Sequence, residues 1–349
     1  MANKFLKKTR IESLGVYFPK KKVSTKEILD QMNFKLPFDL EKVTGIKNRR
    51  FREASENSFI LASKAAKKCL GKSKYKKSDL DVIINTSITQ SKEKFKFMFE
   101  PPMSLFIKKH LGCHSALNFD ISNACAGMFT GIYILDSMIK AGVVKNGMVV
   151  SGECISPIAE NAIEEIKKPL DDQLASLTVG DSGAAIIMDE SVSKNGQINY
   201  IDIMTDADHV DLCVGKSNSK GTQIAMYTKS SELSELGKKI WPPFSNEILK
   251  KNKDSLSRKN YDFIILHQIS VRTINSYLKC GEKFFKTKMP ETLLSVDEFG
   301  NTSSTSHFIT IYKNIKNGKL KKNSKIFMVS LSSGVAIGCL SLSLSDLKI

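Results

Sequence analysis

The sequence predicts an α/β fold made of two similar halves, on the evidence of its strand pattern, its helix pattern and an internal similarity. Short runs rich in Val and Ile, bounded by turn residues, alternate with segments in which apolar residues recur every three or four positions. Because the short runs are almost continuously apolar, we expect strands covered by helices on both faces. The predicted strands lie within 81–88, 148–151, 184–188, 262–266 and 326–329, and amphipathic helices lie at 57–70 and 127–141.

The internal similarity relates two pairs of these strands. Residues 79–85 (Asp-Leu-Asp-Val-Ile-Ile-Asn) are similar to 260–266 (Asn-Tyr-Asp-Phe-Ile-Ile-Leu), and 146–153 are similar to 323–330. The paired strands are 66 residues apart in the first half and 64 in the second. This spacing favours two copies of one α/β unit, although chance similarity among buried strands would explain it equally well.

The division of the chain follows from this repeat. We expect a first half over residues 1–190 that holds a nucleophilic cysteine, and a second half over 191–349. The segment at about 205–250 fits neither copy and contains Trp241-Pro-Pro-Phe, so we interpret it as an insertion or cap.

The composition is that of a globular protein with a strongly positive charge. The 349 residues are 41% hydrophobic and 26% charged, with a formal net charge of +17 that favours an acidic partner. Only six of the 53 cations are Arg and there is one Trp, which argues against nucleic-acid binding. A Lys-rich bias spread over the surface accounts for most of the charge.

The cysteines and the apolar runs indicate the compartment. The seven Cys are odd in number and contain no Cys-x-x-Cys pair, which argues against disulfides and structural zinc and favours a reducing compartment. No apolar stretch follows the basic start, and no run reaches the length of a membrane helix. We therefore expect a cytoplasmic protein without a membrane span.

The Asp, His and Cys residues at 206–213 are irregularly spaced and combine hard and soft metal ligands, so we predict no metal site.

Cys125 is the strongest candidate nucleophile. It lies in Asn-Ala-Cys-Ala-Gly at 123–127, between an apolar strand at 117–121 and the predicted helix that follows. Backbone N–H groups and the helix dipole at such a junction stabilise a thiolate, and the small neighbours leave room for a substrate. A small buried cysteine in a tight turn is the structural alternative.

Three further features could serve this nucleophile. His267 follows the strand at 262–266 and is the expected proton partner. Asn301, in a Gly/Ser/Thr-rich turn, could donate its amide to a developing oxyanion, and Ser333–Gly334 could offer backbone N–H groups. Taken singly, His267 could be a satisfied strand-end histidine and Asn301 a turn former.

The motifs become specific in combination. Asn-Ala-Cys-Ala-Gly, His-Gln, Gly-Asn-Thr-Ser and Ser-Gly-x-x-x-Gly, in this order, resemble the β-ketoacyl-acyl-carrier-protein synthase III group of the thiolase superfamily. The segments 44–50 and 179–185 also match the group, so the resemblance extends from about residue 10 to the C-terminus.

The resemblance implies a thiolase fold, with two halves stacked in α/β/α/β/α layers, and a homodimer. Cys125 would take an acyl group from a thioester, while backbone N–H groups of Cys125 and of Ser333–Gly334 form the oxyanion hole. His267 and Asn301 would bind the thioester carbonyl of the second substrate and stabilise its enolate. No cofactor is implied, because thioesters of acyl carrier protein or coenzyme A are the substrates.

The sequence departs from the members of the group that prime fatty-acid synthesis with acetyl-coenzyme A. Those members hold the coenzyme with a Trp–Arg pair, a further Arg and an Asn. The corresponding positions in this chain are Asp39, Val43, Gln173 and Ser270. The stack on adenine and the cationic grip on phosphate are both lost, so we expect a chain carried by acyl carrier protein.

A second departure is Glu100-Pro101, which precedes Cys125 by 25 residues. It resembles the synthases that join two acyl chains head to head, in olefin and pyrone biosynthesis, where such a Glu crosses the dimer interface and acts as a base. A carboxylate in an apolar tunnel has a raised pKa, which suits that role. For Glu100, the alternative is an exposed loop acid beside a Pro-Pro turn. Glu153, at a strand end, could be a second acid of the site, but we expect it to have a structural role.

Arg272 and Lys279 lie seven residues apart on the helix after His267 and match basic positions with which the group docks acyl carrier protein. Taken together, the resemblance and its departures predict a Claisen condensation of two activated acyl groups in specialised metabolism, such as the formation of polyketide-like lipids, resorcinols, pyrones or long-chain ketones. The alternatives are malonyl-dependent priming or elongation of fatty acids, acyl transfer to an alcohol or amine, and a non-catalytic partner subunit of a synthase.

Overall fold

The computed structural model describes residues 7–92, 98, 100–192, 196–344 and 347–349. Its centre is a pair of five-stranded mixed sheets. The first sheet has the strand order β1-β7-β6-β4-β5 and contains β1 (Thr9–Tyr17), β4 (Val82–Asn85), β5 (Leu117–Asp120), β6 (Asn146–Glu153) and β7 (Ser182–Glu190). The second has the order β12-β11-β13-β14-β8 and contains β8 (Gln197–Thr205), β11 (Phe263–Leu266), β12 (Glu291–Thr292), β13 (Lys325–Ser332) and β14 (Ala336–Ser343).

The two sheets have the same topology. β4 is parallel to β6, with Ile84 paired to Val149, and β11 is parallel to β13, with Ile264 paired to Phe327. On the other side of each pair, β6 is antiparallel to β7 and β13 is antiparallel to β14. The strands recognised as similar in the sequence therefore occupy equivalent places, and the predicted α/β fold with two similar halves is confirmed.

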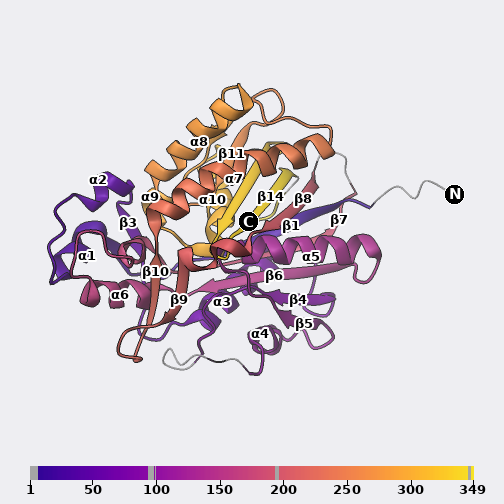
Figure 1. The fold of residues 1–349 in the computed structure, drawn as a ribbon. Coiled ribbons are helices and arrows are strands. Elements are labelled where there is room, and N and C mark those ends of the chain that lie inside the picture. Colours follow the sequence, from indigo (N-terminus) through magenta and orange to yellow (C-terminus); the bar gives the residue numbers. More distant parts are fainter. Residues whose placement is uncertain (1–6, 93–97, 99, 193–195, 345–346) are drawn as a thin grey trace.

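Helices cover both faces of each sheet and complete five layers (Figure 1). The middle layer lies between the sheets, whereas one outer layer covers the first sheet and the other covers the second. The principal helices are α5 (Gly127–Ala141) and α10 (Ser306–Lys316) in the middle, α3 (Ser58–Lys72) and α4 (Met103–Leu111) on the first sheet, and α7 (Ser230–Lys251) and α8 (Val271–Phe285) on the second.

The middle layer holds the main hydrophobic core. Phe129, Ile132 and Leu135 of α5 are fully buried, and so are Phe308 and Ile309 of α10. Burial of each such side chain stabilises the fold by about 1.5–3 kcal/mol. Because α5 and α10 contact strands of both sheets, the turns that precede them meet at the seam between the two halves.

Shorter elements lie at one end of the layers. They are β2 (Lys22–Ser24), α1 (Thr25–Gln31), α2 (Leu40–Thr44), β3 (Asn48–Arg50), α6 (Ser156–Glu165), β9 (Cys213–Ser217), β10 (Ile224–Thr228) and α9 (Val296–Phe299). Within the segment 205–250, the β9–β10 hairpin packs on α6 of the first half, whereas α7 packs on the outer face of the second sheet.

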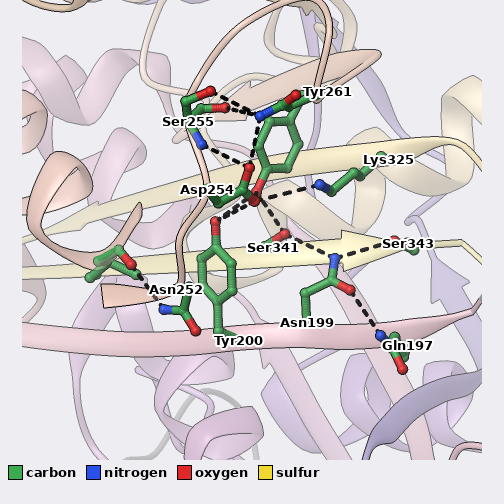
Figure 2. Close-up of polar contacts among 12 residues, drawn as sticks. Gln197, Asn199, Tyr200, Asn252, Asp254, Ser255, Tyr261, Lys325, Ser341 and Ser343 are labelled. Carbon is green, nitrogen blue, oxygen red and sulfur yellow. Dashed lines mark hydrogen bonds and ion pairs between the residues drawn. The ribbon is translucent and has the colours of Figure 1, made fainter. Parts of the chain in front are cut away.

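A polar network anchors the loop between α7 and β11 to the second sheet (Figure 2). The Asp254 carboxylate accepts hydrogen bonds from the hydroxyls of Tyr261 (2.7 Å) and Tyr200 (3.1 Å). The Tyr261 hydroxyl also lies 2.8 Å from the Ser341 hydroxyl on β14. Partial burial acts to raise the pKa of Asp254, but the hydrogen bonds from Tyr261, Tyr200 and the Ser255 backbone help to lower it below its usual value. The network is therefore an anchor for the outer layer, on the side of the sheet where Asn199, Lys325 and Ser343 also lie.

Candidate active site

The candidate site lies where the two middle helices begin. The 3₁₀ turn η1 (Ala124–Ala126) leads into α5, and the 3₁₀ turn η4 (Ser303–Thr305) leads into α10. The two turns contact each other, so the start of one helix in the first half faces its equivalent in the second. Ala124 and Ser303 have positive φ angles of 42° and 53°, a strained conformation for residues with a Cβ.

Cys125 is held at this seam by the second half. Its Sγ accepts a hydrogen bond from the Ser303 hydroxyl at 3.3 Å, and its carbonyl accepts one from the Ser330 hydroxyl at 3.4 Å. The Ser332 hydroxyl donates to the neighbouring Asn123 carbonyl at 3.2 Å. The nucleophile of one half is thus fixed by η4 and by the end of β13.

The Cys125 thiol is protonated in the resting site. Burial raises its pKa to about 12, although the hydrogen bond from Ser303 acts to lower it. Burial thus opposes the stabilisation of a thiolate that is expected from the backbone N–H groups and the helix dipole at this junction. Nucleophilic attack requires a group that takes the proton.

Asn301 is placed by a close approach of two backbone segments. A Cβ on Gly180 would lie 2.2 Å from the Phe299 carbonyl oxygen, so only glycine allows this contact. Asn301 donates its backbone N–H to Thr178 and accepts from Gly180. Its Oδ1 accepts from the Ser303 backbone N–H at 2.9 Å, an arrangement that leaves the amide N–H groups available to donate.

His267 lies directly after β11 and is 4% exposed. Its Nδ1 is 3.1 Å from the Ser306 hydroxyl, so Nε2 is the nitrogen available to a substrate. Burial, together with the neighbouring His307, lowers its pKa to about 3. The imidazole is therefore neutral at neutral pH and able to accept a proton.

The turn at 301–306 joins these three side chains. Ser303 contacts Cys125 through its hydroxyl and Asn301 through its backbone N–H, and Ser306 contacts His267. The sequence indicated the Gly/Ser/Thr-rich turn but not the partners of its hydroxyls. Ser333–Gly334, predicted for the oxyanion hole, follow β13 immediately after Ser332, which contacts the turn before Cys125.

Comparisons with known proteins agree with this arrangement. Residues 119–207 match the family described as 3-oxoacyl-[acyl-carrier-protein (ACP)] synthase III, and residues 252–344 match its C-terminal part, so the two matches together span just over half of the chain. The chain belongs to the synthase III-like condensing enzymes of the thiolase superfamily. It is accordingly an acyltransferase of the synthase III type.

Individual relatives extend the similarity to nearly the whole chain. The β-ketoacyl-[acyl-carrier-protein] synthase III of Ehrlichia canis is 26% identical over 337 residues, which is 95% of this chain and 98% of the relative. That of Aquifex aeolicus is 27% identical over 347 residues, covering 95% and 97%.

Solved structures show the same fold. The Aquifex aeolicus synthase III structure has a TM-score of 0.80 at 24% identity, covering 96% of this chain and 99% of that one. Xanthomonas campestris OleA has a TM-score of 0.83 at 22% identity, covering 97% and 99%. The fold is therefore common to both proteins and does not choose between them.

The four positions at which this synthase III-like chain departs from coenzyme-binding members are mostly occupied by structural contacts. Asp39 caps α2 by accepting from the Lys42 N–H, and Ser270 caps α8 by accepting from the Thr273 N–H. Gln173 is buried, with Oε1 accepting from Asn161 and Nε2 donating to Glu165. Three of the four thus hold the fold and lack a positive charge.

Glu100 and the predicted docking residues lie on the surface of the chain. Glu100 precedes α4, and its side chain is exposed. Arg272 and Lys279 are exposed on one face of α8, and Lys283, one turn further on, continues the same basic stripe.

Glu153 is a buried acid for which the sequence predicted a structural role. Its Oε1 accepts from the hydroxyls of Ser151 and Ser304, each at 2.7 Å. Burial raises its pKa to about 7, although these hydrogen bonds act to lower it. Ser304 is the residue of η4 equivalent to Cys125 of η1, so Glu153 connects to the seam through the second half.

A surface groove of about 760 Å³ lies apart from these residues. Its walls come from α6, from the β9–β10 hairpin and from the loop after β4, and they include Arg52, Cys154 and Glu160. Cys125, His267 and Asn301 do not line it.

Among the described residues, no helix is both long and apolar enough to cross a membrane.

Proposed function

We propose that this protein condenses two acyl thioesters by a Claisen reaction that passes through an acyl group on Cys125. The observation that carries the proposal is the position of the Cys125 thiol at the seam, hydrogen-bonded to Ser303 beside Asn301. Family membership in the synthase III-like acyltransferases supports the reaction class.

In the first half-reaction, the Cys125 sulfur attacks the acyl carbon as its proton moves to Nε2 of His267. The imidazole is neutral at neutral pH and has a lone pair that can accept the proton, although burial lowers its pKa and makes it a weak base. Backbone N–H groups of Cys125 and of Ser333–Gly334 receive the negative charge on the carbonyl oxygen. The carbon–sulfur bond of the donor then breaks, and the departing thiolate takes the proton back.

In the second half-reaction, His267 and Asn301 donate to the thioester carbonyl of the second substrate. The enolate forms when the α-carbon loses a proton to a base or loses a carboxylate as carbon dioxide. The two donors stabilise this enolate, and its α-carbon attacks the acyl group on Cys125. The fixed Oδ1 of Asn301 supports this role, because it directs the amide N–H groups away from the Ser303 backbone. Formation of the carbon–carbon bond frees the Cys125 thiolate.

We infer that acyl carrier protein delivers at least one substrate. Asp39, Gln173 and Ser270 carry structural hydrogen bonds and no cation, which is unfavourable for the phosphates of a free coenzyme. The exposed Arg272 and Lys279 form a basic stripe that complements an acidic carrier. Exchange of both for Glu should slow acylation from the carrier at least 10-fold and leave transfer from acyl-coenzyme A unchanged.

The finer assignment is a head-to-head condensation in specialised metabolism by a homodimer, with Glu100 of each subunit as a base in the site of the other. Its support is the Glu-Pro sequence before α4 and the exposure of Glu100 on the single chain. Exchange of Glu100 for Gln should preserve acylation of Cys125 and abolish the condensed product. Loss of both steps, or of neither, would contradict this role.

Malonyl-dependent priming or elongation is the second candidate, because the curated relatives are named β-ketoacyl-acyl-carrier-protein synthases III. The two candidates differ in whether a carboxylate leaves. Release of carbon dioxide from malonyl-carrier in the presence of a short primer would favour the second.

The test of the common mechanism is the intact mass of the purified protein after incubation with acyl-carrier proteins and acyl-coenzyme A of several chain lengths. We expect a thioester-sized increment that is absent from the Cys125→Ala variant. No increment with any donor would refute the acyl-enzyme and favour a non-catalytic partner subunit, which would leave product formation by a copurifying synthase intact in Cys125→Ala.

A further inference from the structure

A second buried histidine lies next to His267. His307 is the second residue of α10 and is fully buried. Its ring is stacked on that of His267, with centroids 5.8 Å apart and planes inclined by 21°. The Ser306 hydroxyl lies between them, 3.1 Å from Nδ1 of His267 and 3.4 Å from Nδ1 of His307.

The protonation of His307 follows from its other contact. Its Nε2 is 2.9 Å from the Val329 carbonyl oxygen, which can only accept, so Nε2 carries the proton. Burial lowers the pKa of His307 to about 4, and the ring is neutral at neutral pH. Its Nδ1 is therefore an acceptor. The single proton of the Ser306 hydroxyl thus has two acceptors, one on each imidazole.

We propose that Ser306 and His307 form a hydrogen-bond relay that allows His267 to gain and lose a proton, which deepens the proposed function. Neutral His267 can carry its proton on Nε2, in which case Ser306 donates to Nδ1, or on Nδ1, which then donates to Ser306. Only the second form has a lone pair on Nε2 that can accept the proton of Cys125. In that form, and in the charged ring that results, the Ser306 hydroxyl donates to Nδ1 of His307, and every donor in the chain is satisfied as far as the Val329 carbonyl.

His307 is in this sense a positioning residue for acylation. Without an acceptor at its Nδ1, a charged His267 would force the Ser306 hydroxyl to accept without donating inside a buried site. The proton itself moves only from Cys125 to Nε2 of His267 and then to the leaving thiolate. The relay reorients hydrogen bonds and consumes no other reactant.

Two substitutions separate this role from packing. The amide of Asn places an acceptor where Nδ1 of His307 lies, whereas the amide of Gln reaches the place of Nε2. His307→Asn therefore keeps the contact with Ser306 and loses that with Val329, and His307→Gln does the reverse. A purely structural role, in which the bond to Val329 matters, predicts that His307→Gln is the milder variant.

The experiment measures the rate at which iodoacetamide alkylates Cys125, followed by peptide mass at one pH, because this rate reports transfer of the thiol proton without any acyl donor. We expect His307→Gln to react at least 5-fold more slowly than the wild type and His307→Asn to stay within 2-fold. His267→Ala defines the rate without the base. Equal rates for the two His307 variants, or slower reaction of His307→Asn, would overturn the relay.

Ser306→Ala provides a second route if a His307 variant does not fold, as judged by circular dichroism. It should slow alkylation as much as His307→Gln, and the double variant should be no slower than either. Additive losses would overturn the relay. Acyl-enzyme formation from the preferred donor should follow the same order. If no donor acylates the wild type, the proposed function fails while the alkylation order still decides the relay.

Discussion

Glu153→Gln tests the burial of an acid at the seam between the halves. Three donors converge on Oε1 of Glu153, namely the hydroxyls of Ser151 and Ser304 and the Ile88 N–H, and Oε2 has no partner among the described residues. The folded protein holds the carboxyl proton up to a pKa of about 7, whereas an unfolded chain releases it near 4.5.

The sign and size of the pH dependence follow from these two values. Between pH 4.5 and pH 7 unfolding releases a proton, so the stability of the wild type falls as the pH rises. Integrated from pH 5 to pH 8, the loss is about 2–3 kcal/mol. Glutamine has no such proton, and any cost of its amide is independent of pH. The unfolding free energy of Glu153→Gln relative to the wild type should therefore rise by about 2–3 kcal/mol over this range.

The assay is urea denaturation followed by far-ultraviolet circular dichroism at pH 5, 6, 7 and 8 and one protein concentration. Glu12→Gln is the matched control, because burial raises the pKa of Glu12 but hydrogen bonds from Ser73 and Lys74 outweigh it and hold that pKa low. Its difference from the wild type should stay flat from pH 5 to pH 8. A flat difference for Glu153→Gln would refute the assignment of a proton to the buried carboxyl.

Three further predictions concern stability. Gly152→Ala should lower the free energy of unfolding by about 3 kcal/mol or more, because the new Cβ would lie 2.1 Å from the Ser58 carbonyl oxygen. Gly71→Ala, on the open side of α3, should instead raise it by about 0.5–1 kcal/mol. Chemical denaturation of both variants measures the two effects. Tyr261→Phe should lose about 1–3 kcal/mol from the network of Figure 2 and leave Cys125 acylation unchanged, and a loss of acylation would contradict its role as an anchor. Ser24→Ala removes one side of the capping box of α1 and should cost about 1 kcal/mol in the same assay, with an unchanged midpoint counting against the cap.

The repeated sheet could be predicted because buried strands leave a strong apolar signal in the sequence. The runs at 81–88 and 262–266 became the equivalent strands β4 and β11. Cys125 stood out for a similar local reason, since a cysteine flanked by small residues at a strand-to-helix junction is visible without the fold.

The hydroxyl contacts could not be predicted, because they join residues far apart in the chain. Ser303 meets Cys125 across 178 residues, and Ser306 meets His267 across 39. The path of α7 was equally hidden, because Pro242 and Pro243 lie inside the helix. Pro242 has no N–H for the Lys238 carbonyl, and the Cys280 thiol of α8 supplies the missing donor at 3.2 Å.

The meeting of η1 and η4 has a thermodynamic consequence for the whole chain. A ligand that touches Cys125 on one side and η4 on the other binds only when both halves are folded and docked. Its binding free energy therefore stabilises the docked state of both halves, and the two halves unfold together even where the stabilities of their separate cores differ. An inhibitor attached to Cys125 that also contacts η4 would thus stabilise the interface between the halves and raise the melting temperature of elements as remote as α3 and α8.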